Sequence, residues 1–200
     1  MDSINNDLVY NVAQLMKEPL GSTRKFELHT AGLALGDSPD SHEEGTLDAR
    51  DLTGMVRVTR LSRDLLVQGD VSADIHVVCS RCLDEFNLPV QGVLEEQFQP
   101  TIDVETGRPV QRQPFEEDDT AFNISANHEM DLTEPIRQSL LVALPLKPLC
   151  KDDCKGLCPQ CGANLNDGPC GCEIENVDNR WAALRELKLE DLPAGDANLN

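Results

Sequence analysis

The chain has 200 residues, 17 of them basic and 36 acidic, which gives a formal net charge of −19 and an isoelectric point near 4.4. So acidic a surface opposes nonspecific binding to nucleic acid, because such binding depends on Lys and Arg side chains that displace counterions from phosphates. Aromatic residues make up only 4% of the chain, which argues against a platform for base stacking. The composition therefore favours a basic protein as partner.

The N-terminal residues 1–26 contain no basic segment followed by an apolar run, so the sequence predicts no secretory signal. The longest apolar stretch, LLVALPL at 140–146, is too short to span a bilayer. We therefore expect a cytoplasmic protein with no membrane association. In that reducing compartment, clustered cysteines are more often metal ligands than disulfides.

In chain order, the apolar spacing of residues 8–18 predicts a helix, which Pro19 and Gly21 end. Residues 23–30 are expected to form a short strand. The following acidic segment, 37–50, is rich in Asp, Ser, Glu, Gly and Pro, a composition that predicts an exposed loop.

The clearest regular stretch is 65–79, in which residues that suit a core alternate with mostly polar ones. Such alternation predicts a half-buried strand, bent or bulged near Gly69. Residues 55–61 predict a preceding strand, joined to it by a turn at 62–64. The alternation at 86–94 predicts a following strand, so three neighbouring antiparallel strands are expected here.

The second half of the chain begins with a further acidic loop, expected at 101–120, and a brief strand at 122–124. Residues 131–144 have apolar side chains at helical spacing and predict a helix that packs on the sheet. Asp131 or Thr133 is the expected N-cap.

These elements predict an α+β fold with a curved, split-barrel-like antiparallel sheet of about four to six strands, covered by the helix. We expect residues 1–146 to form this core domain. Residues 147–188 are expected to form a cysteine-rich, zinc-ribbon-like module that ends in a helix at 179–188. The tail, 189–200, is expected to be disordered.

Six of the eight cysteines fall in the segment CKDDCKGLCPQCGANLNDGPCGC at 150–172, and the other two form CSRC at 79–82. Thiolates at such spacing, with Pro and Gly around them, are typical of tetrahedral zinc sites. CSRC lies where two antiparallel strands meet, which suits a metal knuckle, whereas a thioredoxin-like redox pair opens a helix. The candidate metal ligands are Cys79, Cys82, Cys150, Cys154, Cys158, Cys161, Cys170 and Cys172.

Eight cysteines suffice for two four-cysteine sites, or for one site with spare thiols. One partition joins CSRC to the two cysteines of CKDDC and leaves the last four cysteines for a second ion. Another pairs CSRC with CPQC, as in a zinc ribbon. The sequence does not choose between them, and CSRC without a metal would be a buried thiol pair in a strand turn.

An all-cysteine site is closed and structural, whereas catalytic zinc keeps an open position and has His or carboxylate ligands. None of the four histidines lies near the 150–172 segment in the sequence. No phosphate-binding glycine loop or nucleophile elbow is present either. We therefore expect no enzymatic activity and no catalytic residue, with one or two Zn²⁺ ions as cofactor. Iron is less favoured, because the aromatic shell of a rubredoxin-like site is missing.

Several ordered stretches together resemble the YceD family, known as large ribosomal RNA subunit accumulation protein. They are NVAQLMKEPLGSTRKFEL at 11–28, CSRCLDEF at 79–86, DLTEPIRQSLLVALPLKPLC at 131–150, CKGLCPQCGANLNDGPCGC at 154–172 and DNRWAALREL at 178–187. The resemblance covers most of the chain. It implies a non-enzymatic ribosome-biogenesis factor that large-subunit (23S-type) ribosomal RNA needs in order to accumulate.

Taken with this resemblance, the acidic charge favours a basic large-subunit ribosomal protein or a pre-ribosomal particle as the partner over direct contact with ribosomal RNA. Two other classes stay open from the sequence. A zinc-ribbon module that binds nucleic acid would need a basic face, yet the lysines of the cysteine segment are offset by Asp152, Asp153 and Asp167. A redox-regulated zinc chaperone would release its metal when its thiols are oxidised.

Overall fold

A computed structural model of the chain describes residues 6–37, 46–110 and 121–172. The chain divides into two compact units, residues 1–154 and 155–200. The helices and strands of the described residues all belong to the first unit. No helix among the described residues is both long and apolar enough to cross a membrane. The domain division expected after residue 146 stays a prediction.

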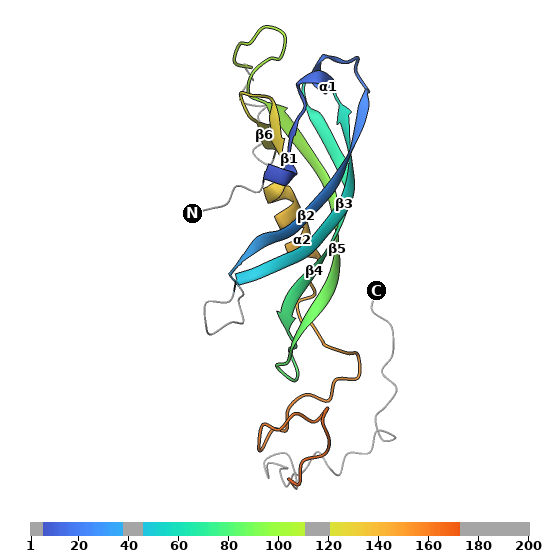
Figure 1. Cartoon of the computed structure of the whole chain (residues 1–200), viewed down its shortest axis with the longest axis vertical. Helices are drawn as coiled ribbons and strands as arrows, with labels where there is room; N and C mark the ends of the chain where they lie inside the picture. The colour runs from blue at the N-terminus through green and yellow to red at the C-terminus, as the bar shows by residue number, and fades with distance from the viewer. Residues whose placement is uncertain (1–5, 38–45, 111–120, 173–200) are drawn as a thin grey trace, which may run out of the picture. The chain divides into compact units, whose positions relative to one another are not determined.

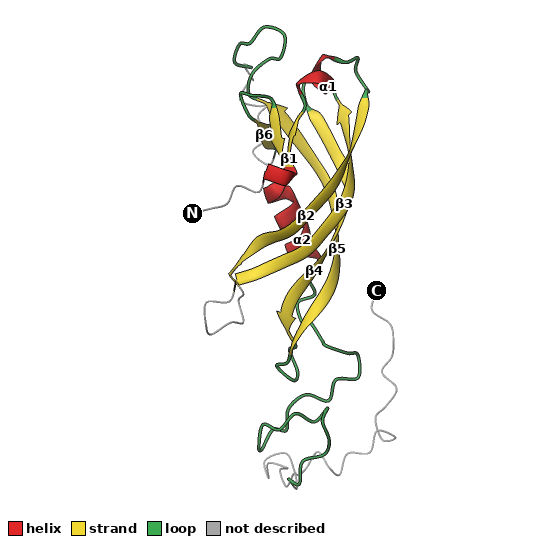
Figure 2. Ribbon diagram, viewed as in Figure 1, coloured by secondary structure: helices red, strands yellow, loops and turns green. Residues whose placement is uncertain are grey.

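A five-stranded sheet forms the body of the first unit, with the strand order β2-β3-β4-β5-β6 (Figure 1). The strands are β2 (Thr23–Asp37), β3 (Thr46–Arg60), β4 (Leu65–Val78), β5 (Glu85–Pro100) and β6 (Phe122–Ile124). Figure 2 shows the long strands curling around the helix α2 (Thr133–Ala143). The predicted α+β fold, a curved sheet covered by this helix, is confirmed. The long strands pair antiparallel, and only the short β6 pairs parallel, with β5, among the described strands.

The inner face of the sheet is apolar because side chains along each long strand alternate between the core and solvent. In β4, every second residue from Val71 to Val77 is buried and the residues between them are exposed. Ile136 and Leu140 of α2 and Leu8 and Leu15 near the N-terminus complete this core, all with 0% exposure. Full burial of such a side chain contributes about 1.5–3 kcal/mol relative to leaving it exposed.

Polar contacts also fix α2 to the curled sheet. Arg137 donates from Nη1 to the backbone oxygen of Leu35 in β2, at 3.0 Å. Its Nε and Nη2 bind the carboxylate of Glu134, both at 2.7 Å, and this pairing lowers the pKa of Glu134 to about 2. Ser139 donates from Oγ to the backbone oxygen of Val93 in β5, at 3.0 Å. The helix therefore bridges two strands that are not neighbours in the sheet.

The N-cap prediction for this helix was wrong. α2 begins at Thr133, with Leu132 as the N-cap residue. Asp131 lies one position earlier, and its Oδ1 accepts a hydrogen bond from the backbone N–H of Thr133 at 2.9 Å. The carboxylate thus still satisfies one of the N–H groups that have no partner within the helix.

The prediction of a helix at 8–18 is also wrong over its first half. The chain forms a 3₁₀ turn (η1, Asn6–Leu8), a short strand (β1, Val9–Asn11) and a single-turn helix (α1, Ala13–Lys17). β1 pairs antiparallel with β7 (Glu129–Asp131), in the register Tyr10 to Met130. This long-range pairing satisfies backbone groups that a helix would otherwise satisfy within the segment.

The strand predicted at 23–30 is too short, and the loop predicted at 37–50 is too long. β2 reaches Asp37 and β3 begins at Thr46, so these strands pair with each other well beyond the expected ends. Residues 38–45 and 111–120, more than half of the first expected acidic loop and half of the second, lie outside the described residues. The predicted helix at 179–188 and tail at 189–200 also lie outside them.

The strand predicted at 65–79 is confirmed as β4, but no bulge lies at Gly69. The pairing of β4 with both neighbours is continuous through Gly69, and the register shifts instead between Arg50 and Thr53 in β3. Gly69 marks a close approach of two strands. A Cβ there would lie 2.2 Å from the backbone oxygen of Met55 and 2.8 Å from Cα of Val56.

We expect Gly69→Ala to destabilise the fold, because the added methyl group meets backbone atoms that cannot move away without shifting β3. Overpacking of this kind costs about 1–3 kcal/mol. Urea denaturation followed by circular dichroism measures the free energy of unfolding. The matched control is Gly32→Ala in β2, where the nearest atom is 3.7 Å from the added Cβ. Equal stabilities of the two variants would contradict the prediction.

Two four-cysteine clusters as candidate metal sites

The first cluster begins in the hairpin between β4 and β5. The two strands pair as far as Val78 and Glu85, so CSRC lies in the connection. Backbone hydrogen bonds close this connection: Cys79 N donates to Asp84 O at 2.9 Å, and Leu83 N donates to Cys79 O at 3.0 Å. Both cysteines of the hairpin are buried, at 0% and 3% exposure. A turn stabilised by the sheet therefore presents two sulfur atoms in fixed positions.

The segment after α2 supplies the other two sulfur atoms. Ser80 N donates to the backbone oxygen of Pro148 at 2.9 Å, and Arg81 donates from Nη1 to the backbone oxygen of Cys154 at 3.0 Å. These bonds hold the segment, which has no helix or strand of its own, against the hairpin. They place Cys150 and Cys154 beside CSRC.

The four sulfur atoms form a compact group. Sγ of Cys79 lies 3.8 Å from Sγ of Cys154, and Sγ of Cys82 lies 3.6 Å from Sγ of Cys150. All four lie within 4.8 Å of one another. A tetrahedral zinc site with Zn–S bonds of about 2.3 Å places its sulfur atoms about 3.8 Å apart. The spacing fits such a site and is far from the bond length of a disulfide, about 2.05 Å.

Within this cluster one thiol ionises easily. Burial of Cys79 disfavours its thiolate, but backbone N–H groups of Cys82, Cys150 and Arg81 point at the sulfur and lower its pKa to about 6. The pKa of Cys82 is raised instead: the N–H of Asp84 favours its thiolate, but burial and the neighbouring sulfur of Cys79 outweigh it. Near neutral pH the metal-free cluster therefore already holds one thiolate, at Cys79.

The second cluster lies in the second unit, and all its ligand candidates come from residues 158–172. In the CPQCG turn, Gly162 has φ of +72°, which suits glycine, and its N–H donates to Cys158 O at 2.9 Å. Cys158 N donates to the backbone oxygen of Ala163 at 2.8 Å. The sulfur atoms of Cys158, Cys161, Cys170 and Cys172 lie within 4.8 Å of one another.

This second cluster repeats the electrostatic pattern of the first. Backbone N–H groups of Cys161 and Gln160 lower the pKa of Cys158 to about 6. The neighbouring thiol of Cys161 raises the pKa of Cys172 to about 12. The second cluster is more open than the first, since only Cys158 of its four cysteines is buried and Cys161 is exposed.

In the structure, the eight cysteines are grouped as in the first of the two partitions considered from the sequence. CSRC meets the cysteines of CKDDC, and the last four cysteines form their own group. CSRC and CPQC do not share a group. Neither cluster contains a histidine or a carboxylate. His76 lies instead on the exposed face of the sheet, where its ring nitrogens contact Asn87 and Glu85.

Sequence reasoning missed the side chain that ties the first cluster together. Arg81 lies between the two cysteines of CSRC and reaches Cys154, 73 residues away. No periodicity or motif indicates that contact, since an arginine in an exposed turn usually faces solvent. The presence of a cation inside a cysteine knuckle is the one signal that the sequence offers.

The chain is similar to known proteins over most of its length. The family described as large ribosomal RNA subunit accumulation protein YceD matches residues 67–188, a range that contains all eight cysteines. An uncharacterized protein of Mycobacterium tuberculosis is 32% identical over 195 residues, which cover 92% of this chain and 83% of that protein. The chloroplastic YCED homolog 1 of Zea mays is 31% identical over 72% of this chain and 62% of its own length. No solved structure gives a significant match.

The fold and site define a protein with a curled sheet, one covering helix and two four-cysteine clusters. The chain belongs to the YceD family. The family name describes an accumulation factor and not an enzyme, and it indicates a role in the accumulation of large-subunit ribosomal RNA.

The lowered pKa values predict that two thiolates form near pH 6 in the reduced, metal-free, folded protein. The ultraviolet thiolate band, titrated against pH, measures them. Cys79→Ser and Cys158→Ser should each remove one. Cys172→Ser is the control, because the pKa of Cys172 is about 12 and its thiol is protonated at neutral pH. A band that rises only near the ordinary thiol pKa of about 8.5 would contradict the prediction.

Proposed function

We propose that the chain holds two Zn²⁺ ions, one in each four-cysteine cluster. The sulfur spacing of the first cluster and the all-cysteine composition of both support this assignment. Four thiolates leave no open position on the metal, so neither ion would bind substrate or activate water. The eight cysteines are therefore proposed as structural ligands, and the protein as a non-enzymatic one.

The first ion would act as a clasp in the first unit. Its ligands join the β4–β5 hairpin to the segment after α2, which are 68 to 75 residues apart in the chain. The second ion would organise residues 157–172, which contain only turns, bends and one isolated bridge between Leu157 and Asn164. A segment with so little secondary structure and a small core would gain much of its stability from a bound metal.

Elemental analysis of the purified protein should give two zinc ions per chain. Cys150→Ser and Cys170→Ser should each retain one, because each removes a ligand from a different cluster. At free zinc about 100-fold above its dissociation constant, one site contributes about 2.7 kcal/mol to folding, so chelation should lower the melting temperature. The Cys150→Ser and Cys170→Ser variants control for each other, because each leaves the other cluster intact. A single ion in the wild-type chain, or loss of both ions from either variant, would disprove the two-site assignment.

We propose further that the protein supports the accumulation of large-subunit ribosomal RNA by binding a basic large-subunit ribosomal protein or its precursor particle in the cytoplasm. The observation that carries this proposal is the net charge of −19 in a member of this family. Ribosomal proteins must neutralise RNA phosphates and are therefore basic. An acidic protein can shield such a chain before it reaches its RNA, whereas it would be repelled by the RNA itself.

Titration calorimetry with individually purified large-subunit proteins of the source organism tests this proposal. We expect at least one basic protein to bind with a dissociation constant in the micromolar range or below, about −8 kcal/mol. Its affinity should fall as salt increases, because charge pairs at the rim of the interface are screened. An unrelated protein of equal basic charge is the control.

The competing outcome is equally clear. Tight binding to naked large-subunit ribosomal RNA, weakening steeply with salt, together with no affinity for any large-subunit protein, would overturn the proposal in favour of a nucleic-acid-binding module.

A further inference from the structure

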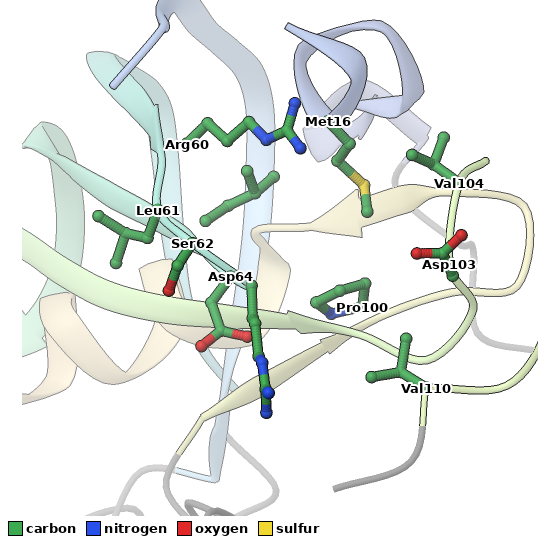
Figure 3. Close-up of a pocket in the computed structure, with 11 residues that line it drawn as sticks. Met16, Arg60, Leu61, Ser62, Asp64, Pro100, Asp103, Val104 and Val110 are labelled. Carbon is green, nitrogen blue, oxygen red and sulfur yellow. The ribbon is translucent and has the colours of Figure 1, made fainter. Parts of the chain in front are cut away.

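A cavity of about 230 Å³ lies at the end of the sheet where β3 turns into β4. Figure 3 shows its walls, which come from α1, the β3–β4 turn and the loop that follows β5. It is smaller than the roughly 300–1,000 Å³ of a pocket for a drug-sized ligand. Its size suits a single side chain of a partner protein.

The wall is mixed in character. Six of its eleven residues are apolar: Met16, Leu61, Leu65, Pro100, Val104 and Val110. Leu61 is 37% exposed, so apolar surface remains at the cavity mouth. A ligand with a stem of methylene groups suits these apolar residues, since an unpaired polar stem against them would lose its hydration.

One carboxylate on the wall is held in a fixed position. Oδ1 of Asp103 accepts hydrogen bonds from the backbone N–H groups of Glu105 and Thr106, at 3.1 and 2.7 Å, and from the hydroxyl of Thr106, at 2.8 Å. These bonds lower the pKa of Asp103. Oδ2 accepts no hydrogen bond from the described residues and remains available to a donor from outside.

The other charged groups of the lining are engaged within the chain. Arg60 donates from its guanidinium to the backbone oxygen of Glu18, and Asp64 accepts a hydrogen bond from Gln97 at 2.7 Å. Arg63 also has a partner in the chain. An anionic ligand could pair with Arg60 only by breaking its hydrogen bond to the backbone oxygen of Glu18. A cationic ligand can bind Oδ2 of Asp103 without breaking a hydrogen bond.

We propose that this cavity binds a lysine or arginine side chain, with its aliphatic stem against the apolar residues of the wall and its charged end at Asp103. These side chains combine an apolar stem with a cationic head, which suits the cavity. That the side chain belongs to a basic large-subunit protein rests on the proposed function. The chemistry of the cavity does not.

The first experiment needs no partner. Methyl NMR of Met16, Val104 and Val110 in the full chain follows titrations with Nα-acetyl-lysine methylamide and Nα-acetyl-arginine methylamide. The norleucine analogue keeps the stem and lacks the charge, and the glutamate analogue reverses the charge. We expect saturable shifts with a cationic probe and much smaller ones with the other two. No shifts at these methyl groups with either cationic probe, or equal shifts with the norleucine or glutamate analogue, would overturn the proposal.

Two variants locate the contact. Asp103→Asn keeps the Oδ1 acceptor and removes the charge, so the cationic probes should lose their shifts. Glu105→Gln is the matched control, because it removes the same charge from an exposed residue of the same loop that does not line the cavity. Leu61→Lys, at an exposed position, places an ammonium group at the mouth and should block the probes by occupying the cavity.

The second experiment uses the large-subunit protein that binds in calorimetry. Asp103→Asn should weaken that binding by about tenfold or more, since a hydrogen bond to a charged group is lost, and Glu105→Gln should leave it nearly unchanged. Equal affinities of the two variants would overturn the role of the cavity in partner binding while leaving the proposed function intact. If no large-subunit protein binds, the proposed function fails, and the probe titrations still decide the chemistry of the cavity.

Discussion

Four sulfur atoms converge where two distant segments of the first unit meet, the hairpin that carries CSRC and the segment after α2. The segment after α2 has no helix or strand, and its fixed position rests on Ser80, Arg81 and the buried cysteines. Cys79, Cys82 and Cys154 form a small core there, packed with Leu149 and with Phe86, which also packs against the main core of the sheet. A cluster this small buries little apolar area, so a metal bound by its thiolates would supply most of its cohesion.

The hairpin can present its sulfur atoms accurately because the sheet behind it is rigid. β4 pairs with β3 and β5 over nearly its whole length, and α2 bridges β2 and β5 through Arg137 and Ser139. Burial of the apolar face of the sheet and these polar bridges both stabilise the curvature of the sheet, because the helix fills its concave side (Figure 2). Preorganisation of this kind lets thiols reach a metal with little further loss of conformational entropy.

The sequence predicted those features that depend on local pattern. Alternation located β4 and β5, helical spacing located α2, and cysteine spacing with Pro and Gly indicated metal sites. Features that depend on distant partners could not be predicted. The segment from Val9 to Asn11 carries a helical pattern, yet its backbone pairs with residues about 120 positions later. The partition of the cysteines likewise depends on where the segment after α2 runs, which only the packed hairpin decides. The fixed carboxylate of Asp103 arises from a turn closed by Thr106, and neither residue belongs to any periodic pattern.

β4 separates the two sites proposed for the first unit. The turn that lines the cavity precedes this strand and the cysteine hairpin follows it, so its 14 residues lie between them. At about 3.3 Å per residue, an uninterrupted strand of that length spans roughly 45 Å. β5 also runs from the cysteine hairpin to Pro100 in the cavity wall, so changes at one end reach the other through β4 and β5, whose long paired ladder resists local deformation. The metal clasp and the cavity are therefore expected to be independent: loss of the metal should leave the environment of Asp103 intact, and a partner anchored at the cavity needs no thiolate to bind. Such a separation would let the proposed metal site and the proposed binding cavity coexist in one small protein without either constraining the chemistry of the other.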